Sequence, residues 1–480
     1  MTVLKDPELV NSEVSTLDEL QLEVSASSAD TKTANLASEL GINHKKLIVN
    51  ISNANVYGMA SELKLTGNQY NTALTLFFVP YIFFEVFGNY CIKFVKPHIW
   101  LSGSVFLFGA ITVGMGFVKN FGALAATRFL LGIVESVLFC GIFYVLSTFY
   151  TMRESQRRFS AFFSCTALAG AASGAIAYRV DSLDGLHGYS SWRWIFILEG
   201  CATIIGSFVL FYILTDFPEQ ARFLSTKEKH FLKQKLEWYA GASVAYEITN
   251  TWRDVVKCLK DWLIWLPSLS YFGLIIPSYG YAYFAATIIN QMGYTAVSAQ
   301  QHSVYPWVCA FGVINIVAFA SDYFKKRLPF LIGAMVIAIV GLAMILGATD
   351  KPQVRYGGCF LAASGLYTAM PLIVCWAALN NGSHLRKSVG TAWQIGFGNI
   401  GGIIATFIFL SKDAPVYKPG LSTCLAAVCF AMLTGVAYFF YCLHMNKIKQ
   451  TDAYKQKFNE LPEREQVNLG DRNPNFVYLY

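Results

Sequence analysis

The chain has 480 residues, of which 55% are hydrophobic and only 14% are charged. Soluble domains carry about 25% charged residues, so this composition excludes an ordinary soluble protein. Each bilayer crossing takes roughly 20 apolar residues, so the chain has room for roughly ten or more spans and for no large soluble domain. The net charge of +7 does not indicate nucleic-acid binding, because membrane proteins gather Lys and Arg in cytoplasmic loops. We therefore expect a lipid bilayer as a partner and no nucleic acid.

Residues 1–70 are a polar stretch that we expect to hold an amino-terminal tail and the segment before the first visible span. Five apolar runs follow, each long enough for a membrane helix, at residues 71–92, 100–118, 122–150, 159–178 and 194–215. They define a predicted amino-terminal bundle over residues 71–215.

A charged segment, residues 216–261, is the longest polar interruption between spans and holds eight Lys and Arg residues. We interpret it as a cytoplasmic linker between two halves. Six further apolar runs come after it, at residues 262–286, 304–320, 329–348, 356–380, 389–410 and 420–444. They define a predicted carboxy-terminal bundle over residues 262–444, which a cytoplasmic tail over residues 445–480 follows.

Basic residues alternate between the loops in the way that a polytopic helical protein requires. Loops on one side hold 18 Lys and Arg residues and loops on the other side hold 7, so the richer side is the predicted cytoplasmic side. Five spans before the linker and six after it are unequal for a fold of two repeated halves, and the first helix is the one missing from the pattern. The predicted fold class is an all-α polytopic membrane protein with 11 visible spans in two helical bundles.

The third apolar run carries two charged residues, Arg128 and Glu135, on either side of Gly132. A charge near the bilayer centre costs roughly 2.5–3.5 kcal/mol, so a buried ionisable residue is a functional hypothesis. Seven residues make nearly two helical turns, which places all three on one stripe with about 10 Å between the charges. We expect the stripe to face a cavity in which Arg128 attracts an anion and Glu135 binds and releases a proton. The alternative is a structural Arg and Glu that neighbouring helices satisfy.

Other polar or aromatic side chains inside the spans are candidates for the lining of a cavity. They are Glu85, Tyr281, Trp376, Gln394 and Asn399. Tyr279 and Tyr283 crowd the same span as Tyr281, and we expect some of the three to line the cavity. Glu85 lies near the predicted cytoplasmic end of its span, where a structural interpretation is favoured. Taken singly, polar groups within spans are more often helix–helix hydrogen bonders than ligand contacts. Glu199 and the nearby Trp192 and Trp194 lie close to the predicted outer surface and favour a structural role.

The chain has no motif for a cofactor, a metal site or an enzyme. Its seven His residues are scattered without paired ligand spacing, and its cysteines form no C-x-x-C pair. A Walker motif is absent as well, which disfavours nucleotide hydrolysis as the energy source. We therefore expect a secondary transporter without cofactor or metal.

Several segments together resemble the major facilitator superfamily, and more narrowly its fungal allantoate permease family of anion:cation symporters. They are residues 65–71, 128–135, 188–200, 216–219, 398–402 and the ending 471–478. The resemblance implies a multi-pass proton symporter of the plasma membrane that works by alternating access. Its solute would be a small organic anion, such as an allantoate-like carboxylate, a vitamin acid or a sulfonate. The resemblance also implies anion binding by Arg128 and proton coupling by Glu135, and we expect a monomer.

The same resemblance shows a departure near the start of the chain. Residues 50–58 resemble the stretch just after the family's first helix, and residues 44–48 resemble the stretch before it, yet the two stretches are adjacent. In similar transporters that helix carries an acidic residue, a partner for the arginine that matches Arg128. A second hypothesis therefore stays open, a non-transporting sensor or a decayed paralogue, because a half with five spans need not alternate.

Overall fold

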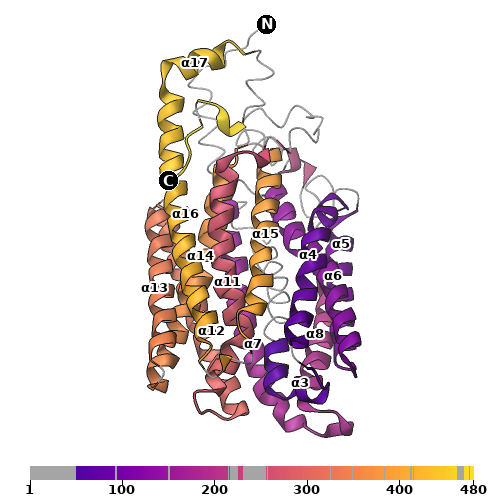
Figure 1. Cartoon of the computed structure of the whole chain (residues 1–480). Coiled ribbons are helices and arrows are strands. Elements are labelled where there is room, and N and C mark those ends of the chain that lie inside the picture. The colour runs from indigo at the N-terminus through magenta and orange to yellow at the C-terminus, as the bar shows by residue number, and fades with distance from the viewer. Residues whose placement is uncertain are drawn as a thin grey trace.

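The computed structural model describes residues 50–66, 68–91, 95–149, 152–214, 216, 225–226, 228–230, 256, 258–324, 326–348, 350–382, 384–410, 413–414, 416–461, 470–474 and 476–480. The predicted tail before residue 50 and most of the predicted linker at 216–261 lie outside these residues. Long α-helices make up most of the described part and stand side by side in two bundles (Figure 1).

The first bundle has one long helix for each apolar run predicted before the linker. These helices are α4 (Gln69–Cys91), α5 (Pro97–Met115), α6 (Phe121–Phe149), α7 (Met152–Val180) and α8 (Ser191–Ile213). Apolar side chains place these segments in hydrocarbon, where the backbone must satisfy its own hydrogen bonds, so the helical form follows from the composition.

The second bundle likewise has one long helix for each apolar run predicted after the linker. These helices are α11 (Trp262–Asn290), α12 (Ala296–Phe324), α13 (Leu328–Gly347), α14 (Pro352–Asn380), α15 (His384–Phe407) and α16 (Lys418–Gln450). A short helix, α17 (Asp452–Asn459), continues beyond the bundle after α16 (Figure 1). Eight of the described helices are long and apolar enough to cross a membrane, which confirms an all-helical, multi-pass membrane protein. The count of 11 spans stays a prediction.

The innermost helices of the second bundle are α11 and α14. In each of these two helices, 89% of the most apolar 18-residue stretch is buried inside the protein. In α16 the corresponding share is 28%, because this helix exposes one face to the surroundings. α11 packs against α14, α15 and α16, and α14 packs against α13 and α12. Side chains of α11 and α14 are therefore well placed to face the other bundle.

The two bundles meet where α7 packs against α12 and where α4 packs against α15. Gly170 allows α7 to approach closely, because a Cβ there would lie 2.6 Å from the ring of Trp307 on α12. Near the start of α4, Asn71 donates a 2.6 Å hydrogen bond to the carbonyl of Thr406 at the end of α15. Thr75 adds a 2.7 Å hydrogen bond to the hydroxyl of the same threonine. These contacts join the halves toward the predicted outer side.

Residues 50–56 are helical and lead into the short helix α3 (Met59–Glu62). Buried polar side chains tie this segment to the first bundle. Asn50 donates to the carboxylate of Glu199 on α8, and Asn53 donates a 3.0 Å hydrogen bond to a serine of α7. The hydroxyl of Tyr57 donates a 2.9 Å hydrogen bond to a carbonyl of α7. The segment predicted to follow a first helix thus packs against α7 and α8.

Arg193, at the outer end of α8, has every guanidinium nitrogen paired. Its Nε and Nη2 lie 3.1 and 2.9 Å from Oε1 of Glu62, and its Nη1 donates to two backbone carbonyls at 2.9 and 2.8 Å. Burial would raise the pKa of Glu62, but hydrogen bonds from Ser190, Trp192 and Arg193 and the arginine's charge together lower it below the ordinary value. This cluster joins α3 to α8 at the predicted outer surface.

Candidate functional site

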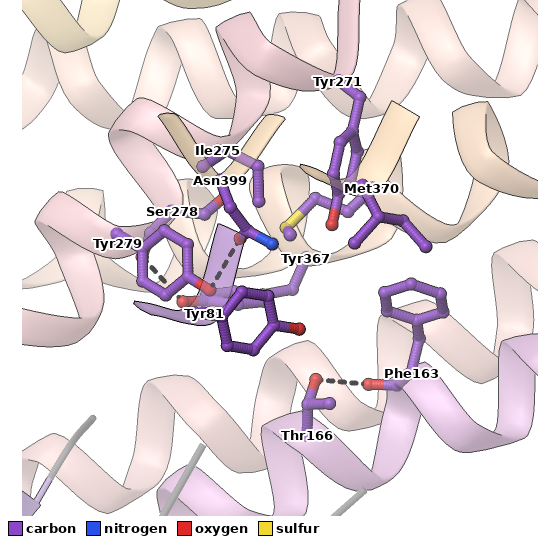
Figure 2. A pocket seen from close by; sticks show the side chains of 11 residues that line it. Tyr81, Phe163, Thr166, Tyr271, Ile275, Ser278, Tyr279, Tyr367, Met370 and Asn399 are labelled. Carbon is purple, nitrogen blue, oxygen red and sulfur yellow. Dashed lines mark hydrogen bonds between the residues drawn. The ribbon is translucent and has the colours of Figure 1, made fainter. Parts of the chain in front are cut away.

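A small cavity lies between the two bundles. The first bundle contributes residues of α4 and α7 to its wall, and the second bundle contributes residues of α11, α14 and α15 (Figure 2). The lining residues are Tyr81, Phe163, Thr166, Tyr271, Ile275, Ser278, Tyr279, Tyr367, Met370, Ile395 and Asn399. The cavity measures about 30 Å³. A water needs roughly 10–15 Å³ by this measure, so the cavity holds no more than a few waters in this conformation.

Tyrosines dominate the polar part of the wall. The hydroxyl of Tyr279 donates a 3.3 Å hydrogen bond to Oδ1 of Asn399, and the hydroxyl of Tyr367 donates a 2.8 Å hydrogen bond to the carbonyl of Ser278 (Figure 2). None of the lining residues is charged. The wall therefore combines aromatic and aliphatic faces with several hydroxyls and one amide.

Arg128 lies on α6 and is fully buried. Its Nε makes a long hydrogen bond of 3.4 Å to the carbonyl of Ala73 on α4, and its guanidinium carbon sits 5.1 Å from the centre of the Phe77 ring. The hydroxyls of Tyr283 and Tyr70 interact with its charge. Tyr283 does not reach good hydrogen-bond geometry, however, and Nη1 and Nη2 have no hydrogen-bond partner among the described residues. None of the ion pairs formed within the described part of the chain includes Arg128.

Two stacked tyrosines of α11 connect Arg128 to the cavity. Tyr283 faces Arg128, and its ring lies nearly parallel to the ring of Tyr279, with 6.0 Å between centroids and 22° between planes. Tyr279 in turn lines the cavity and meets Phe78 of α4 edge to face at 5.0 Å. The guanidinium is thus outside the cavity wall and one aromatic layer away from it.

The predicted stripe on α6 faces α4. At Gly132 a Cβ would lie 2.8 Å from the ring of Pro80 and closer still to the carbonyl oxygen of Phe77, so only glycine permits this approach. Glu135 is buried, with 1% of its surface exposed. Arg128 and Glu135 are therefore both placed within the protein and not in lipid, while their roles in binding and coupling stay predictions.

The predicted cavity candidates of α4 and α15 lie at or near the interface between the bundles. Asn399 lines the cavity itself. Glu85 is buried and lies against α15, since a Cβ on Gly396 would be 3.1 Å from its Oε2. Gln394 donates a 3.3 Å hydrogen bond to the carbonyl of Pro267, which ties α15 to α11.

Two other candidates point elsewhere. Tyr281 packs against Trp307 of α12, with ring centroids 5.5 Å apart, on the side of α11 away from Tyr279. Trp376 donates a 2.8 Å hydrogen bond to the carbonyl of Leu479 and packs edge to face on Tyr438. Neither residue is among those that line the cavity.

Tyr279, one of the three tyrosines that crowd this span, lines the cavity as expected for some of them, but three other lining residues of α11 were not predicted although a signal was present. Tyr271, Ile275 and Ser278 lie with Tyr279 at positions i, i+4, i+7 and i+8, the spacing of one helical face. Their mixture of aromatic and hydroxyl groups separates this face from the rest of the helix. Among the residues that the structure describes, no group of three or more His, Cys, Asp or Glu could hold a metal ion.

Comparison with known proteins places the chain among membrane transporters. A sequence model described as Major Facilitator Superfamily matches residues 47–406. The high-affinity nicotinic acid transporter of Saccharomyces cerevisiae is 32% identical over 443 residues, which cover 90% of this chain and 80% of that protein. The MFS-type transporter cnsO of Penicillium expansum is 30% identical, with 90% and 85% covered.

A solved structure shares the fold. The proton:xylose symporter XylE, bound to 6-bromo-6-deoxy-D-glucose, superposes with a TM-score of 0.69 over 85% of this chain and 95% of that one. The sequence identity is only 14%, so this likeness concerns the arrangement of the helices alone.

Proposed function

Because this chain belongs to the Major Facilitator Superfamily and is a secondary transporter, we propose that it imports a small organic anion together with protons across the plasma membrane. The two bundles would rock about the central cavity, which opens in turn to each side. The relatives compared above are named as transporters, which supports transport rather than catalysis.

The observation that carries the proposal is the state of Arg128. A buried guanidinium whose two terminal nitrogens lack partners among the described residues pays a desolvation cost of about 1–3 kcal/mol per group, and more where the group is charged. A cost of this size favours a ligand that supplies the missing acceptors. The planar fork of arginine matches the two oxygens of a carboxylate or sulfonate, which supports an organic anion as the solute.

Proton coupling is assigned to Glu135. It is buried on the same face of α6 as Arg128, about 10 Å further along the helix, and a carboxylate in that setting can exchange a proton when the cavity opens. The negative charge of the anion and the positive charge of a proton that enters with it cancel, so the net charge of the site stays nearly unchanged. This balance would ease the passage of the loaded carrier through its closed state.

Nicotinate is the first solute that we propose to test. It is a planar ring with one carboxylate, and a similar transporter is named for nicotinic acid. The ring would lie among the tyrosines of the cavity while the carboxylate displaces Tyr283 and reaches Arg128. The cavity must widen for this, since it has room only for a few waters in the present conformation.

Uptake of labelled nicotinate by yeast that lacks its own carrier tests the proposal. We expect saturable accumulation that collapses when a protonophore dissipates the proton gradient. The Glu135→Gln variant should lose accumulation but keep exchange of labelled for unlabelled solute, and Arg128→Lys should fail in both. A normal pH dependence of accumulation in Glu135→Gln would remove the proton role.

The same uptake assay, repeated with other labelled organic anions, separates a transporter from a protein that does not transport. If the correctly localised protein accumulates no vitamin acid, allantoate-like carboxylate or sulfonate, a non-transporting sensor or decayed paralogue becomes the better account. If it accumulates one of these but not nicotinate, anion transport stands and the solute assignment is wrong.

A further inference from the structure

The end of the chain packs against the second bundle at the predicted cytoplasmic side. The described residues of this tail segment are 470–474 and 476–480, and Figure 1 places the carboxyl terminus beside α16 at the same end of the bundle as α17. Tyr478 is 2% exposed and Asp471 is completely buried. Burial of this degree, beyond the last long helix of the bundle, requires contacts that hold the segment in place.

Two asparagines hold the backbone of the tail segment. Asn446 of α16 donates a 2.9 Å hydrogen bond to the carbonyl of Tyr478 and accepts one of 2.9 Å from its N–H. Asn380, the last residue of α14, donates a 3.0 Å hydrogen bond to the carbonyl of Leu479 and accepts one of 2.7 Å from its N–H. Trp376 donates to the same carbonyl at 2.8 Å. Each asparagine amide thus donates one hydrogen bond to the backbone of a single tail residue and accepts one from it, as a neighbouring β-strand would.

Charged side chains connect the tail segment to two more helices. Arg386, in the first turn of α15, lies 3.2 Å from Oδ1 of Asp471 and 2.6 Å from Oδ2 of Asp261, the residue that caps α11. Arg472 reaches the same Asp261 oxygen at 3.2 Å. Lys449 of α16 donates to the carbonyl of Asp471. The tail segment therefore contacts the cytoplasmic ends of α14, α15 and α16 and the cap of α11.

The fit is close enough to require a glycine. At Gly382, in the connection between α14 and α15, a Cβ would lie 2.6 Å from the backbone nitrogen of Asp471 and 2.8 Å from its Cα. Real Cβ atoms do not approach backbone this closely, so a side chain here would displace the tail segment. The backbone at this position is not in the left-handed region, so an alanine would act through this contact and not through φ.

We propose that the tail segment is a brace that fixes the cytoplasmic ends of α11, α14, α15 and α16 and thereby positions the cavity wall. Three of these helices carry cavity residues, namely Tyr279 on α11, Tyr367 on α14 and Asn399 on α15. The hydrogen bonds and ion pairs described above for the brace lie within the second half and its junction with the linker. Through these contacts the brace acts as a stiffener of one rocking body.

Two substitutions of glycine by alanine distinguish a specific release of the tail segment from a general loss of stability. Gly382→Ala pushes on the tail segment, whereas Gly333→Ala, in α13, adds a methyl group in open space and is the matched control. In the purified full-length protein, carboxypeptidase should remove the last residues roughly tenfold faster from Gly382→Ala, because cleavage follows the released population. Hydrogen–deuterium exchange of peptides from residues 366–380 and 386–400 should also accelerate. Gly333→Ala should match the wild type in both assays.

A chain truncated after residue 469 provides the second measurement, and neither assay depends on which solute is carried. If Gly382→Ala acts by releasing the brace, adding it to the truncated chain should not accelerate exchange further, since the two changes remove the same contacts. Wild-type cleavage or wild-type exchange in Gly382→Ala would overturn the proposal. Additive acceleration in the doubly altered chain would overturn it as well, because the alanine would then act without the tail segment.

Discussion

Replacing Arg128 with methionine tests whether the buried guanidinium is kept for a solute or for the fold. Methionine has a similar length and needs no hydrogen bond, so the substitution removes two nitrogens that have no hydrogen-bond partner among the described residues and cost about 1–3 kcal/mol each. It also removes the contact with Phe77, worth about 0.5–2 kcal/mol, and the long hydrogen bond to Ala73. The balance predicts a variant that is as stable as the wild type or more stable by about 1–2 kcal/mol.

Arg193→Met is the matched control because this arginine has all its nitrogens paired. Removing it leaves two buried backbone carbonyls without their donor, while Glu62 is partly exposed and keeps its hydrogen bonds from Ser190 and Trp192, so we expect a loss of about 1–3 kcal/mol. Apparent melting temperatures of the purified proteins, measured at one scan rate because membrane proteins unfold irreversibly, should fall for Arg193→Met and hold or rise for Arg128→Met.

Ligand-induced stabilisation completes this test. A solute at 100 times its Kd stabilises the folded state by about 2.7 kcal/mol, which should appear as a higher melting temperature of the wild type in nicotinate and disappear in Arg128→Met. A drop in the melting temperature of Arg128→Met as large as that of Arg193→Met would refute the reasoning. The guanidinium would then be a structural element whose partners the described contacts do not reveal.

Three further changes have defined outcomes. Gly132→Ala should cost about 1–3 kcal/mol in thermal unfolding, because its methyl group overlaps a carbonyl of α4, whereas Gly114→Ala, in open space, should be neutral. Tyr279→Leu should raise the KM for nicotinate about tenfold, with a smaller rise for Tyr279→Phe, which keeps the ring; equal effects would exclude stacking. The lowered pKa of Glu62 means that its contribution to stability is present above its ordinary value of 4.5 and is lost as the pH falls through the folded pKa. The melting temperatures of wild type and Glu62→Gln should therefore differ by a constant amount near neutral pH and converge below pH 4.5, and parallel curves down to pH 3 would contradict this.

Apolar runs were sufficient to predict the helices, because in hydrocarbon no other backbone form satisfies its hydrogen bonds. Their ends were predicted less well. The run at 159–178 became α7 (Met152–Val180), and the run at 304–320 became α12 (Ala296–Phe324). Helical hydrogen bonding continues into polar residues beyond the membrane, so hydropathy underestimates helix length. The cost of a charge inside a span singled out Arg128 and Glu135 as candidates, and both are buried in the structure, while their roles stay predictions.

Which polar residue of a span faces the cavity could not be read from the sequence. Trp376 and Asn399 look alike as candidates, yet one bonds to Leu479 and the other lines the wall. The difference arises from a partner 103 residues away along the chain, at a place that no local pattern defines. Resemblance had marked residues 471–478 as distinctive, but only the folded contacts show that they cover the ends of four helices.

Three buried arginines show how the protein distributes its charges. Arg193 joins α8 to α3 at the predicted outer end, and Arg386 joins α15 to α11 and the tail segment at the predicted inner end. Both have carboxylate partners within their own half, so their charges stay balanced whichever way the halves rock. Arg128 faces α11 of the other half with no carboxylate among its described contacts, so the proposed rocking of the halves would change its environment. A cation whose surroundings depend on the conformation can bind an anion on one side and release it on the other, whereas the two anchored arginines cannot.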